Sequence, residues 1–358
     1  MNIVLNFILF IVMLLAIIIV HEFGHFIVAK AFNVYVPEFS IGMGKALYQK
    51  KGKETTFSIR LLPIGGYCAI ANAPDDFDEQ IDVETLTVDE SRTLKGISKF
   101  KKILILLAGV FMNFVLALVI MSLVYLSIGQ VAVASKPVIT EVMADSPALN
   151  AGLMVDDDIK KVEYENGYSM SISSYSDLSD FLSLYESGDI TLTVERDGKD
   201  VTIVVTPDTS SGSAYIGVKF GQYEYQKVNL LNCWKYGYDY LKELTLLLIT
   251  VVKGLFRGVG LNNLSGPVGV YKATSDAVSN GMIYYYVLAA TLSLNVGIFN
   301  LIPIPALDGG RIVLTLIEAI IRKPISKKVE SYIIGLSYAL FLLLFIFATG
   351  QDLLKLFK

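Results

Sequence analysis

Val20-His21-Glu22-Phe23-Gly24-His25 lies near the end of an apolar run that begins at Ile3, and it contains both histidines of the 358-residue chain. Spaced four residues apart on a helix of about 3.6 residues per turn, His21 and His25 project from one face, as two nitrogen ligands of a zinc ion must. Glu22 lies about 100° round the helix, where a carboxylate can act on water beside the metal without binding the metal. The spacing predicts half of a zinc site, and the alternative is a chance match with two packed core histidines.

The apolar setting of this stretch favours the metal. Every residue from Ile3 to Val20 is apolar except Asn6, and the run to about Ala29 is long enough to cross about 30 Å of hydrocarbon. It has no basic n-region and no small-residue cleavage site, so we expect a retained span rather than a signal peptide. Each ionisable group at mid-bilayer costs on the order of 2.5 kcal/mol or more without a partner. Two histidines and a glutamate there require partners, and a zinc ion is one.

The composition predicts a polytopic membrane protein. Hydrophobic residues make up 53% of the chain, and its mean hydropathy is +0.55, which is too apolar for an ordinary soluble domain. A net charge of −4 with no basic cluster argues against a nucleic-acid partner. Cys68 and Cys233 form no CxxC pair and are expected on opposite sides of the membrane, so no disulfide is expected. Three further spans are predicted at about 103–128, 282–301 and 332–348.

Basic residues predict the orientation of these spans. Eleven Lys or Arg lie between Lys30 and Lys102 and none precedes the first span, so this segment is expected in the cytoplasm and the N-terminus outside. Within it, the acidic stretch from Asp75 to Glu90 is expected to be a solvated loop. Basic residues from Arg311 to Lys328 place the loop after the third span in the cytoplasm as well, and the fourth span returns the chain to the outside.

A β-hairpin is predicted in the first cytoplasmic segment. Ala46-Gln49 and Thr55-Leu62 flank turn residues Lys50 to Lys53. The hairpin leads into Pro63-Ile64-Gly65-Gly66-Tyr67, where paired glycines indicate a close backbone approach. A free edge of the hairpin could hold an extended substrate by strand addition, and an ordinary structural hairpin is an equally good interpretation.

The stretch from about Gln130 to Gln222 changes to short β-branched runs separated by Gly, Asp and Ser, as in a soluble domain of about 90 residues. Val138-Val142, Ala151-Leu153 and Asp157-Ile159 resemble parts of a PDZ domain core. Asp156 stands where such domains usually have glycine. Peptide binding does not follow from this resemblance, because a size filter or spacer is at least as good a role.

These features divide the chain into eight segments. They are a first transmembrane helix (1–30), a hairpin and loop region (31–102), a second transmembrane helix (103–128), a PDZ-like domain (129–222), an outer juxtamembrane region (223–281), a third transmembrane helix (282–304), a loop with a cytoplasmic helix (305–331), and a fourth transmembrane helix with the C-terminus (332–358). The predicted fold class is a polytopic α-helical membrane protein with four transmembrane helices, a cytoplasmic-side β-hairpin and an inserted extracytoplasmic PDZ-like α+β domain.

The third span ends in a sequence that must unwind the helix. Asn300 is followed by Pro303 and Pro305, and unwound backbone at membrane depth is tolerated only inside protein or beside a water-filled cavity. Asp308 follows directly and is the best carboxylate to complete the site that the two histidines begin. The alternative for Asp308 is the N-cap of a helix over Gly309-Ile321.

Three other features carry expectations of their own. Asn113 lies one turn after the small pair Ala108-Gly109 in the second span, so it should face the bundle interior. An interhelical hydrogen bond and a substrate contact are equally good roles for it. Leu241-Leu255 is interrupted by charged residues and is expected to be interfacial rather than spanning. Leu264-Gly269 is a turn-forming loop to which periodicity assigns no role.

Taken in chain order, the motifs resemble the site-2 protease family of intramembrane zinc proteases, in particular the bacterial RseP/RasP type with a PDZ domain. The resemblance rests on His21-Glu22-Phe23-Gly24-His25, on Phe57 to Tyr67, on Asn113, on the PDZ-like insert, and on Asn300-x-x-Pro303 with Leu307-Asp308-Gly309. One departure is that Val110 follows Gly109, where such proteins commonly have Gly-Pro. No ligand is lost by it.

The resemblance implies the residue roles. One Zn²⁺ ion would be bound by His21, His25 and Asp308, with Glu22 as general base. Residues near the substrate would be Ser58, Ile59, Arg60, Gly65, Gly66, Asn113, Asn300 and Pro303.

The expected function is a zinc-dependent intramembrane endopeptidase of the bacterial cell membrane. Its partners would be the lipid bilayer and single-pass substrates, such as anti-sigma factors or remnant signal peptides, some of them trimmed first by a site-1 type protease. A zinc transporter or metallochaperone is one alternative, but it would want further polar groups along a path. A PDZ scaffold with an inactive membrane half is another, but it would have no reason to keep His, Glu, His and Asp together.

Overall fold

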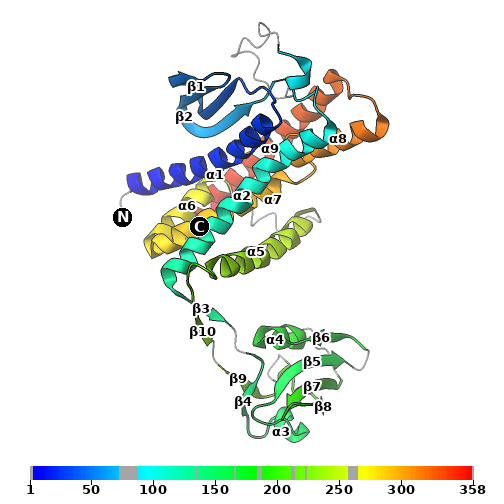
Figure 1. Ribbon diagram of the computed structural model, residues 1–358. Helices are drawn as coiled ribbons and strands as arrows, with labels where there is room; N and C mark the ends of the chain where they lie inside the picture. Colours follow the sequence, from blue (N-terminus) through cyan, green and yellow to red (C-terminus); the bar gives the residue numbers. More distant parts are fainter. Residues whose placement is uncertain are drawn as a thin grey trace. The chain divides into compact units, whose positions relative to one another are not determined.

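The computed structural model describes residues 3–71, 88–133, 136–164, 167–183, 188–210, 214–221, 224–256 and 265–356. The chain forms two compact units, one of Met1–Ser127 with Asn229–Lys358 and one of Ile128–Val228 (Figure 1). We refer to them as the membrane unit and the inserted unit. Most of the predicted acidic loop, Asp75 to Glu90, falls outside the described residues.

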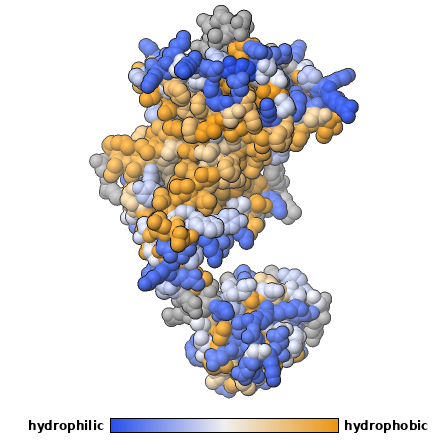
Figure 2. Space-filling model, viewed as in Figure 1, coloured by the Kyte–Doolittle hydropathy of each residue, from blue (hydrophilic) through white to orange (hydrophobic). Residues whose placement is uncertain are grey.

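Among the described residues of the membrane unit, four helices are long and apolar enough to cross a bilayer, which confirms the four predicted spans. They are α1 (Ile3–Ala31), α2 (Lys99–Ile128), α7 (Met282–Asn300) and α9 (Lys327–Leu356). Figure 2 shows a broad apolar band on this face of the membrane unit, with hydrophilic residues on both sides of the band. Helix α5 (Cys233–Phe256) covers the stretch expected to be interfacial, and it is not among the spans found in the described residues.

Helix packing in the membrane unit places α1 and α2 against α7. Met13 and Ile17 of α1 are buried against Tyr285 and Ala289 of α7. On another face of α7, buried residues of α2, α5 and α7 form a second cluster. The Tyr285 hydroxyl also donates to the carbonyl of Leu9 at 3.0 Å. The buried tyrosine therefore has a hydrogen-bond partner for its polar group, as burial in an apolar environment requires.

The predicted hairpin is present and is more elaborate than expected. Strands β1 (Glu38–Lys51) and β2 (Thr56–Ala69) pair in antiparallel register next to the turn, where Lys51 faces Thr56. The start of β1 also pairs with both halves of β2, because Phe39 faces Phe57 in parallel register and Cys68 in antiparallel register. Each strand therefore doubles back and contributes two segments. The segment order is 66–69, 38–41, 56–59 and 48–51.

Glycines allow these strands to double back. Gly42 and Gly44 of β1 and Gly65 of β2 have φ between +81° and +83°, a left-handed conformation that side chains with a Cβ disfavour. A Cβ on Gly42 would also lie 2.5 Å from the carbonyl oxygen of Leu62. The sequence signal at Gly65-Gly66 therefore marks a bend.

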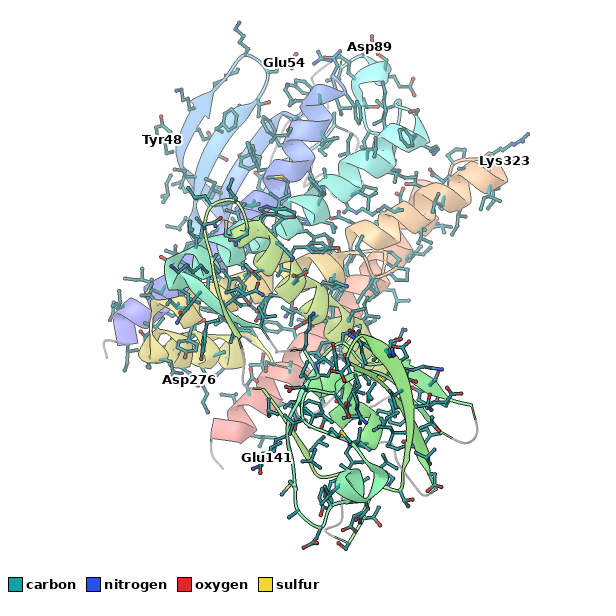
Figure 3. The ribbon with its side chains drawn as sticks, turned by 60° about the horizontal axis from the view of Figure 1, so that its bottom comes forward. Tyr48, Glu54, Asp89, Glu141, Asp276 and Lys323 are labelled. Carbon is teal, nitrogen blue, oxygen red and sulfur yellow. The ribbon has the colours of Figure 1, made fainter. Side chains whose placement is uncertain are left out.

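Side chains fix the sheet to α1. Phe26 of α1 packs on Phe39 and Phe57, with ring centroids 5.5 and 5.8 Å away. Glu54, in the turn, pairs with Lys30 at 2.5 Å and Arg92 at 2.7 Å, and Figure 3 shows it at the tip of the hairpin. The short helix η2 (Glu90–Arg92) supplies that arginine.

The loop Leu264-Gly269, to which periodicity assigns no role, holds the start of helix α6 (Pro267–Asn280). The backbone N–H groups of Gly266 and Gly269 donate to the buried carboxylate of Asp352 in α9, at 2.8 and 2.7 Å. A Cβ on Gly269 would lie 2.7 Å from the other carboxylate oxygen. A carboxylate at a helix N-terminus satisfies free N–H groups and suits the helix dipole. The described part of the loop, from Ser265 on, thus ties α6 to α9.

The inserted unit is a small α+β fold. The strands are β3 (Gln130–Val133), β4 (Ile139–Val142), β5 (Asp158–Tyr164), β6 (Ser169–Ser171), β7 (Ile190–Arg196), β8 (Lys199–Val205), β9 (Val218–Phe220) and β10 (Glu224–Lys227). A four-stranded sheet has the order β6-β5-β7-β8, and two further strand pairs, β3 with β10 and β4 with β9, are antiparallel. The described residues of this unit also form helices α3 (Pro147–Ala151) and α4 (Tyr175–Ser183).

Asp156, which stands where PDZ domains usually have glycine, lies at a turn with a left-handed backbone conformation. Asp156 adopts φ +72°, and aspartate tolerates this left-handed conformation better than most residues other than glycine. Its neighbour Asp157 is fully buried and accepts two hydrogen bonds from Arg196, at 2.6 and 2.7 Å. An aspartate therefore occupies a left-handed turn position here, in a unit whose core includes Ile159 and Leu192.

Candidate metal centre

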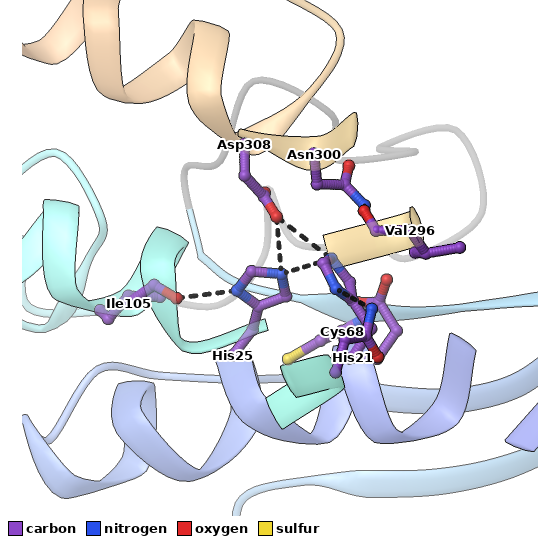
Figure 4. A network of polar contacts seen from close by, with 9 residues as sticks. His21, His25, Cys68, Ile105, Val296, Asn300 and Asp308 are labelled. Atoms are coloured by element: carbon purple, nitrogen blue, oxygen red, sulfur yellow. Dashed lines mark hydrogen bonds and ion pairs between the residues drawn. The ribbon is translucent and has the colours of Figure 1, made fainter. Parts of the chain in front are cut away.

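Three side-chain atoms from α1 and from helix α8 (Asp308–Ile321) converge at one point (Figure 4). His21 Nε2 lies 3.2 Å from His25 Nε2, and Asp308 Oδ2 lies 3.1 and 3.4 Å from the two nitrogens. Zinc binds such atoms at about 2.0 to 2.2 Å, so two corners of a tetrahedron around it are about 3.3 to 3.5 Å apart. The observed separations of 3.1, 3.2 and 3.4 Å lie within about 0.2 Å of that edge length. Among the described residues this is the one group of three or more His, Cys, Asp or Glu able to hold a metal.

Two glycines let α1 and α2 approach closely enough to enclose the histidines. A Cβ on Gly24 of α1 would lie 2.3 Å from the carbonyl oxygen of Ala108 in α2. A Cβ on Gly109 of α2 would lie 2.4 Å from His25 Nε2. Ala108 and Gly109, the two small residues noted in the second span, therefore pack directly against Gly24 and His25 of α1. Helix α2 continues through Val110, where the family pattern has proline.

The far nitrogen of each imidazole has a polar partner. His25 Nδ1 lies 2.8 Å from the backbone carbonyl oxygen of Ile105. His21 Nδ1 lies 3.2 Å from the side-chain amide of Asn113. Such partners hold a ring in place and decide which nitrogen carries the proton. Both rings are therefore oriented with Nε2 toward Asp308.

Asp308 is placed by the irregular backbone that follows α7. Leu307 is the N-cap residue of α8 and Asp308 is its first helical residue. The Asp308 carboxylate contacts the two imidazoles, so the structure does not use it as the N-cap. A Cβ on Gly309 or Gly310 would lie 2.3 or 2.1 Å from a backbone carbonyl oxygen of the preceding loop. The glycines after Asp308 therefore let the helix start pack on that loop.

Glu22 is held by a backbone group of the hairpin. The backbone N–H of Cys68 in β2 donates to Glu22 Oε2 at 3.0 Å. This contact joins the residue next to His21 to the sheet segment 66–69. Burial raises the pKa of the Cys68 thiol well above its usual value, and the charge of Glu22 adds to the effect.

Three of the residues expected near the substrate lie in the middle of the sheet. The Ser58 hydroxyl donates to the carboxylate of Glu38, and Arg60 donates to the same carboxylate at 2.8 Å. Arg60 also donates to the carbonyl of Gly44 at 2.6 Å. The side chain of Ile59 is exposed. Segment 56–59 pairs on both sides, so its backbone has no free edge, unlike the outer segment that contains Tyr48 (Figure 3).

The other expected contacts are spread around the centre. Asn113 lies on the metal site, whereas the Asn300 side chain donates to the carbonyl of Val296 in its own helix, at 3.0 Å. Pro303 is exposed in the loop before Asp308, and Gly65 and Gly66 form the bend that leads into segment 66–69.

Three contributors were not found from the sequence. The carbonyl of Ile105 and the N–H of Cys68 are backbone groups, and no residue pattern identifies them. Glu38 could have been noticed, because it is an acidic residue at the start of a strand segment that is buried. Its partners across the sheet are Ser58 and Arg60.

Comparison with known proteins adds independent findings. The profile of "Peptidase family M50" matches residues 9–344. The chain is 33% identical to "Putative zinc metalloprotease FN1322" of Fusobacterium nucleatum, over 99% of this chain and 100% of that one. It is 29% identical to "Probable protease eep" of Enterococcus faecalis, over 97% and 98%. It is 31% identical to "Putative zinc metalloprotease CPE1693" of Clostridium perfringens, over 95% and 96%.

Proposed function

Because the chain belongs to peptidase family M50 and is a site-2-type intramembrane zinc protease, we propose that His21, His25 and Asp308 hold its zinc ion and that Glu22 is its general base. The observation that carries this proposal is the convergence of three ligand atoms at separations of 3.1 to 3.4 Å, with Glu22 next to His21 in sequence. When bound, zinc supplies Lewis-acid chemistry, which acidifies water and polarises the scissile carbonyl.

Glu22 takes the proton of the attacking water and passes it to the leaving amine. The Cys68 N–H holds Oε2 of the carboxylate, so the second oxygen is left for the proton. The same hydrogen bond favours the orientation of the Glu22 side chain toward segment 66–69. Asp308 and the two imidazoles are then the donors that fix the metal.

The sheet aligns the substrate through its edge beside α1. A helical substrate hides its carbonyls in its own hydrogen bonds and must unwind before it can be cut. Segment 66–69 is at the edge of the segment order and carries the N–H that reaches Glu22, whereas Ser58 to Arg60 lie in a segment that is already paired. An extended substrate adds as a strand at the bend and segment from Gly65 to Cys68. Ser58 and Arg60 support this edge from inside the sheet through Glu38.

The basic residues support the orientation. The N-terminus lies outside, and the hairpin and the loop after Asp308 face the cytoplasm of a bacterial cell membrane. The inserted unit is then an extracytoplasmic PDZ-like domain, which its strand pairing and the left-handed turn at Asp156 support. It acts as a filter that excludes substrates not yet trimmed by an earlier protease. Anti-sigma factors and remnant signal peptides are the substrate classes.

A transporter or metallochaperone would need a series of metal-binding groups. The described residues contain the one cluster at His21, His25 and Asp308, which fits a catalytic centre better than a path.

The proposed function is tested in proteoliposomes that contain the purified protein and a single-pass substrate tagged at both ends. Removing zinc with a chelator should abolish cleavage, and adding back one equivalent of zinc should restore it. A zinc-sensitive dye inside the vesicles measures transport in the same sample, and we expect no flux above protein-free vesicles. Zinc flux without cleavage would support the transporter, and cleavage that survives complete zinc removal would contradict the metal-dependent mechanism.

A further inference from the structure

Asn113 is buried within the helix bundle with a single side-chain hydrogen bond. Its side chain is fully buried, and its Nδ2 lies 3.2 Å from His21 Nδ1. Its Oδ1 has no hydrogen-bond partner among the described residues. Its backbone carbonyl accepts from the hydroxyl of Ser293 in α7 at 2.9 Å, so the contact between helices uses the main chain. The amide itself is directed at the imidazole.

The partner of His25 fixes the proton on that ring. The carbonyl oxygen of Ile105 can only accept a hydrogen bond, so His25 Nδ1, at 2.8 Å, must carry the hydrogen. The lone pair of a neutral His25 is then on Nε2, which faces Asp308. This is the tautomer that a metal ligand bonded through Nε2 requires.

His21 needs the same tautomer, but its partner is an amide instead of a carbonyl. An amide can present either its oxygen or its NH₂ group to the same nitrogen, by rotating about its terminal bond within nearly the same volume. With Nδ2 toward the ring, Nδ1 is the acceptor and the hydrogen sits on Nε2, which lies 3.1 Å from Asp308 Oδ2. That arrangement suits a histidine without a metal.

We propose that Asn113 is a positioning residue for the zinc centre, and that in the zinc-loaded protein its Oδ1 accepts the Nδ1 hydrogen of His21. The amide turns over when zinc binds, and it thereby holds the lone pair of His21 on Nε2. An asparagine can donate to His21 Nδ1 in the zinc-free protein and accept from it in the zinc-loaded protein. A carboxylate could only accept, and an apolar side chain could neither donate nor accept. The inference rests on the proposed ligand set, and it assigns to Asn113 a role on the metal side rather than on the substrate side.

The chain suits a direct measurement, because His21 and His25 are its only histidines. Protein labelled with ¹⁵N in histidine has four imidazole nitrogens, and their chemical shifts distinguish protonated, bare and metal-bound nitrogen. In the zinc-loaded wild type, we expect both Nδ1 atoms to be protonated and both Nε2 atoms to bind the metal. In the zinc-free protein, we expect His21 to carry its hydrogen on Nε2, while His25 keeps it on Nδ1.

Two substitutions separate hydrogen bonding from packing. Asn113→Leu removes the acceptor, and we expect zinc affinity, measured by competition with a chelator, to fall about 10- to 100-fold, with His25 unchanged in the spectrum. Asn113→Asp keeps an acceptor, so the zinc-loaded protein should retain a protonated His21 Nδ1 and most of its affinity. Ser293→Ala is the matched control: it removes the other hydrogen bond of Asn113 and should leave affinity and spectrum unchanged.

Zinc-loaded Asn113→Leu with wild-type affinity and an unchanged His21 spectrum would overturn the inference. If that variant does not fold, Asn113→Asp carries the test, and loss of the protonated His21 Nδ1 in its zinc-loaded form would overturn it. Failure of the underlying zinc assignment looks different. In that case neither imidazole of the wild type shows a metal-bound nitrogen.

Discussion

Replacing Glu22 by glutamine is expected to lower the cleavage rate about 10³-fold while one zinc ion stays bound per chain. Glutamine has nearly the shape of glutamate and still accepts the hydrogen bond from the Cys68 N–H through its oxygen. It cannot take up a proton, so the attacking water is no longer activated and the leaving amine is not protonated. The rate is measured with the doubly tagged substrate in proteoliposomes, and zinc content by elemental analysis of the same sample.

Glu54→Gln is the matched control for this substitution. Glu54 is a carboxylate of the same membrane unit, partly exposed, and its ion pairs with Lys30 and Arg92 are at the surface, where such pairs contribute little. We expect it to keep wild-type cleavage. Cleavage that survives Glu22→Gln would exclude Glu22 as the base. Loss of zinc together with activity would show instead that Glu22 is a ligand.

Asp308→Ala is expected to reduce bound zinc from one ion per chain to a small fraction after dialysis against a chelator. The change leaves two imidazoles, whereas a catalytic zinc site uses three protein ligands. It also removes the ionic contacts of both histidines at 3.1 and 3.4 Å. Cleavage should be lost at the same time and should recover only in part when zinc is in large excess.

Glu318→Gln is the control for this second substitution. Glu318 lies in the same helix α8, where it pairs with Lys99 and accepts from the N–H of Ile325. It has no contact with the proposed ligands among the described interactions, so its loss should leave the zinc content at one per chain. If the Asp308→Ala protein still binds one zinc ion per chain, another group is the third ligand and the proposed role of Asp308 is wrong.

The spans were predictable because their signal is local. A membrane helix must satisfy its backbone internally and bury a long apolar surface in lipid, so length and composition suffice to find it. The second and fourth helices extend beyond the predicted spans, from Lys99 and from Lys327. Charged turns at their ends are polar but can still be helical, and hydropathy does not mark where such helices begin.

The doubled sheet was not predictable in the same way. Alternation and turn residues indicate a hairpin, but the pairing of Phe39 with both Phe57 and Cys68 depends on contacts between distant segments. Gly42 and Gly44, where β1 bends, carry no signal that distinguishes a bend from an ordinary strand glycine. The resemblance places Ser58 to Arg60 near the substrate, and only the structure shows that the backbone of Ser58 and Ile59 is paired on both sides.

The four residues that we propose as zinc ligands and general base were singled out from their types and spacing. Asp308 could be joined to the histidines across some 280 residues of chain because the positive-inside rule placed them on the same side. Their supports could not be predicted, because the Ile105 carbonyl and the Cys68 N–H belong to the backbone. Asn113 was found as a buried amide, and only the structure shows that it faces His21.

The central claim is that this zinc centre cuts a peptide bond inside the membrane. The most direct test is to incubate the wild-type protein in proteoliposomes with a single-pass substrate and to identify the new termini by mass spectrometry. We predict one principal cut within the apolar segment of the substrate, in its cytoplasmic half, and no such product in the zinc-free sample. Termini that lie only in the soluble flanks of the substrate, or an apolar segment that stays intact while zinc is bound, would contradict the account.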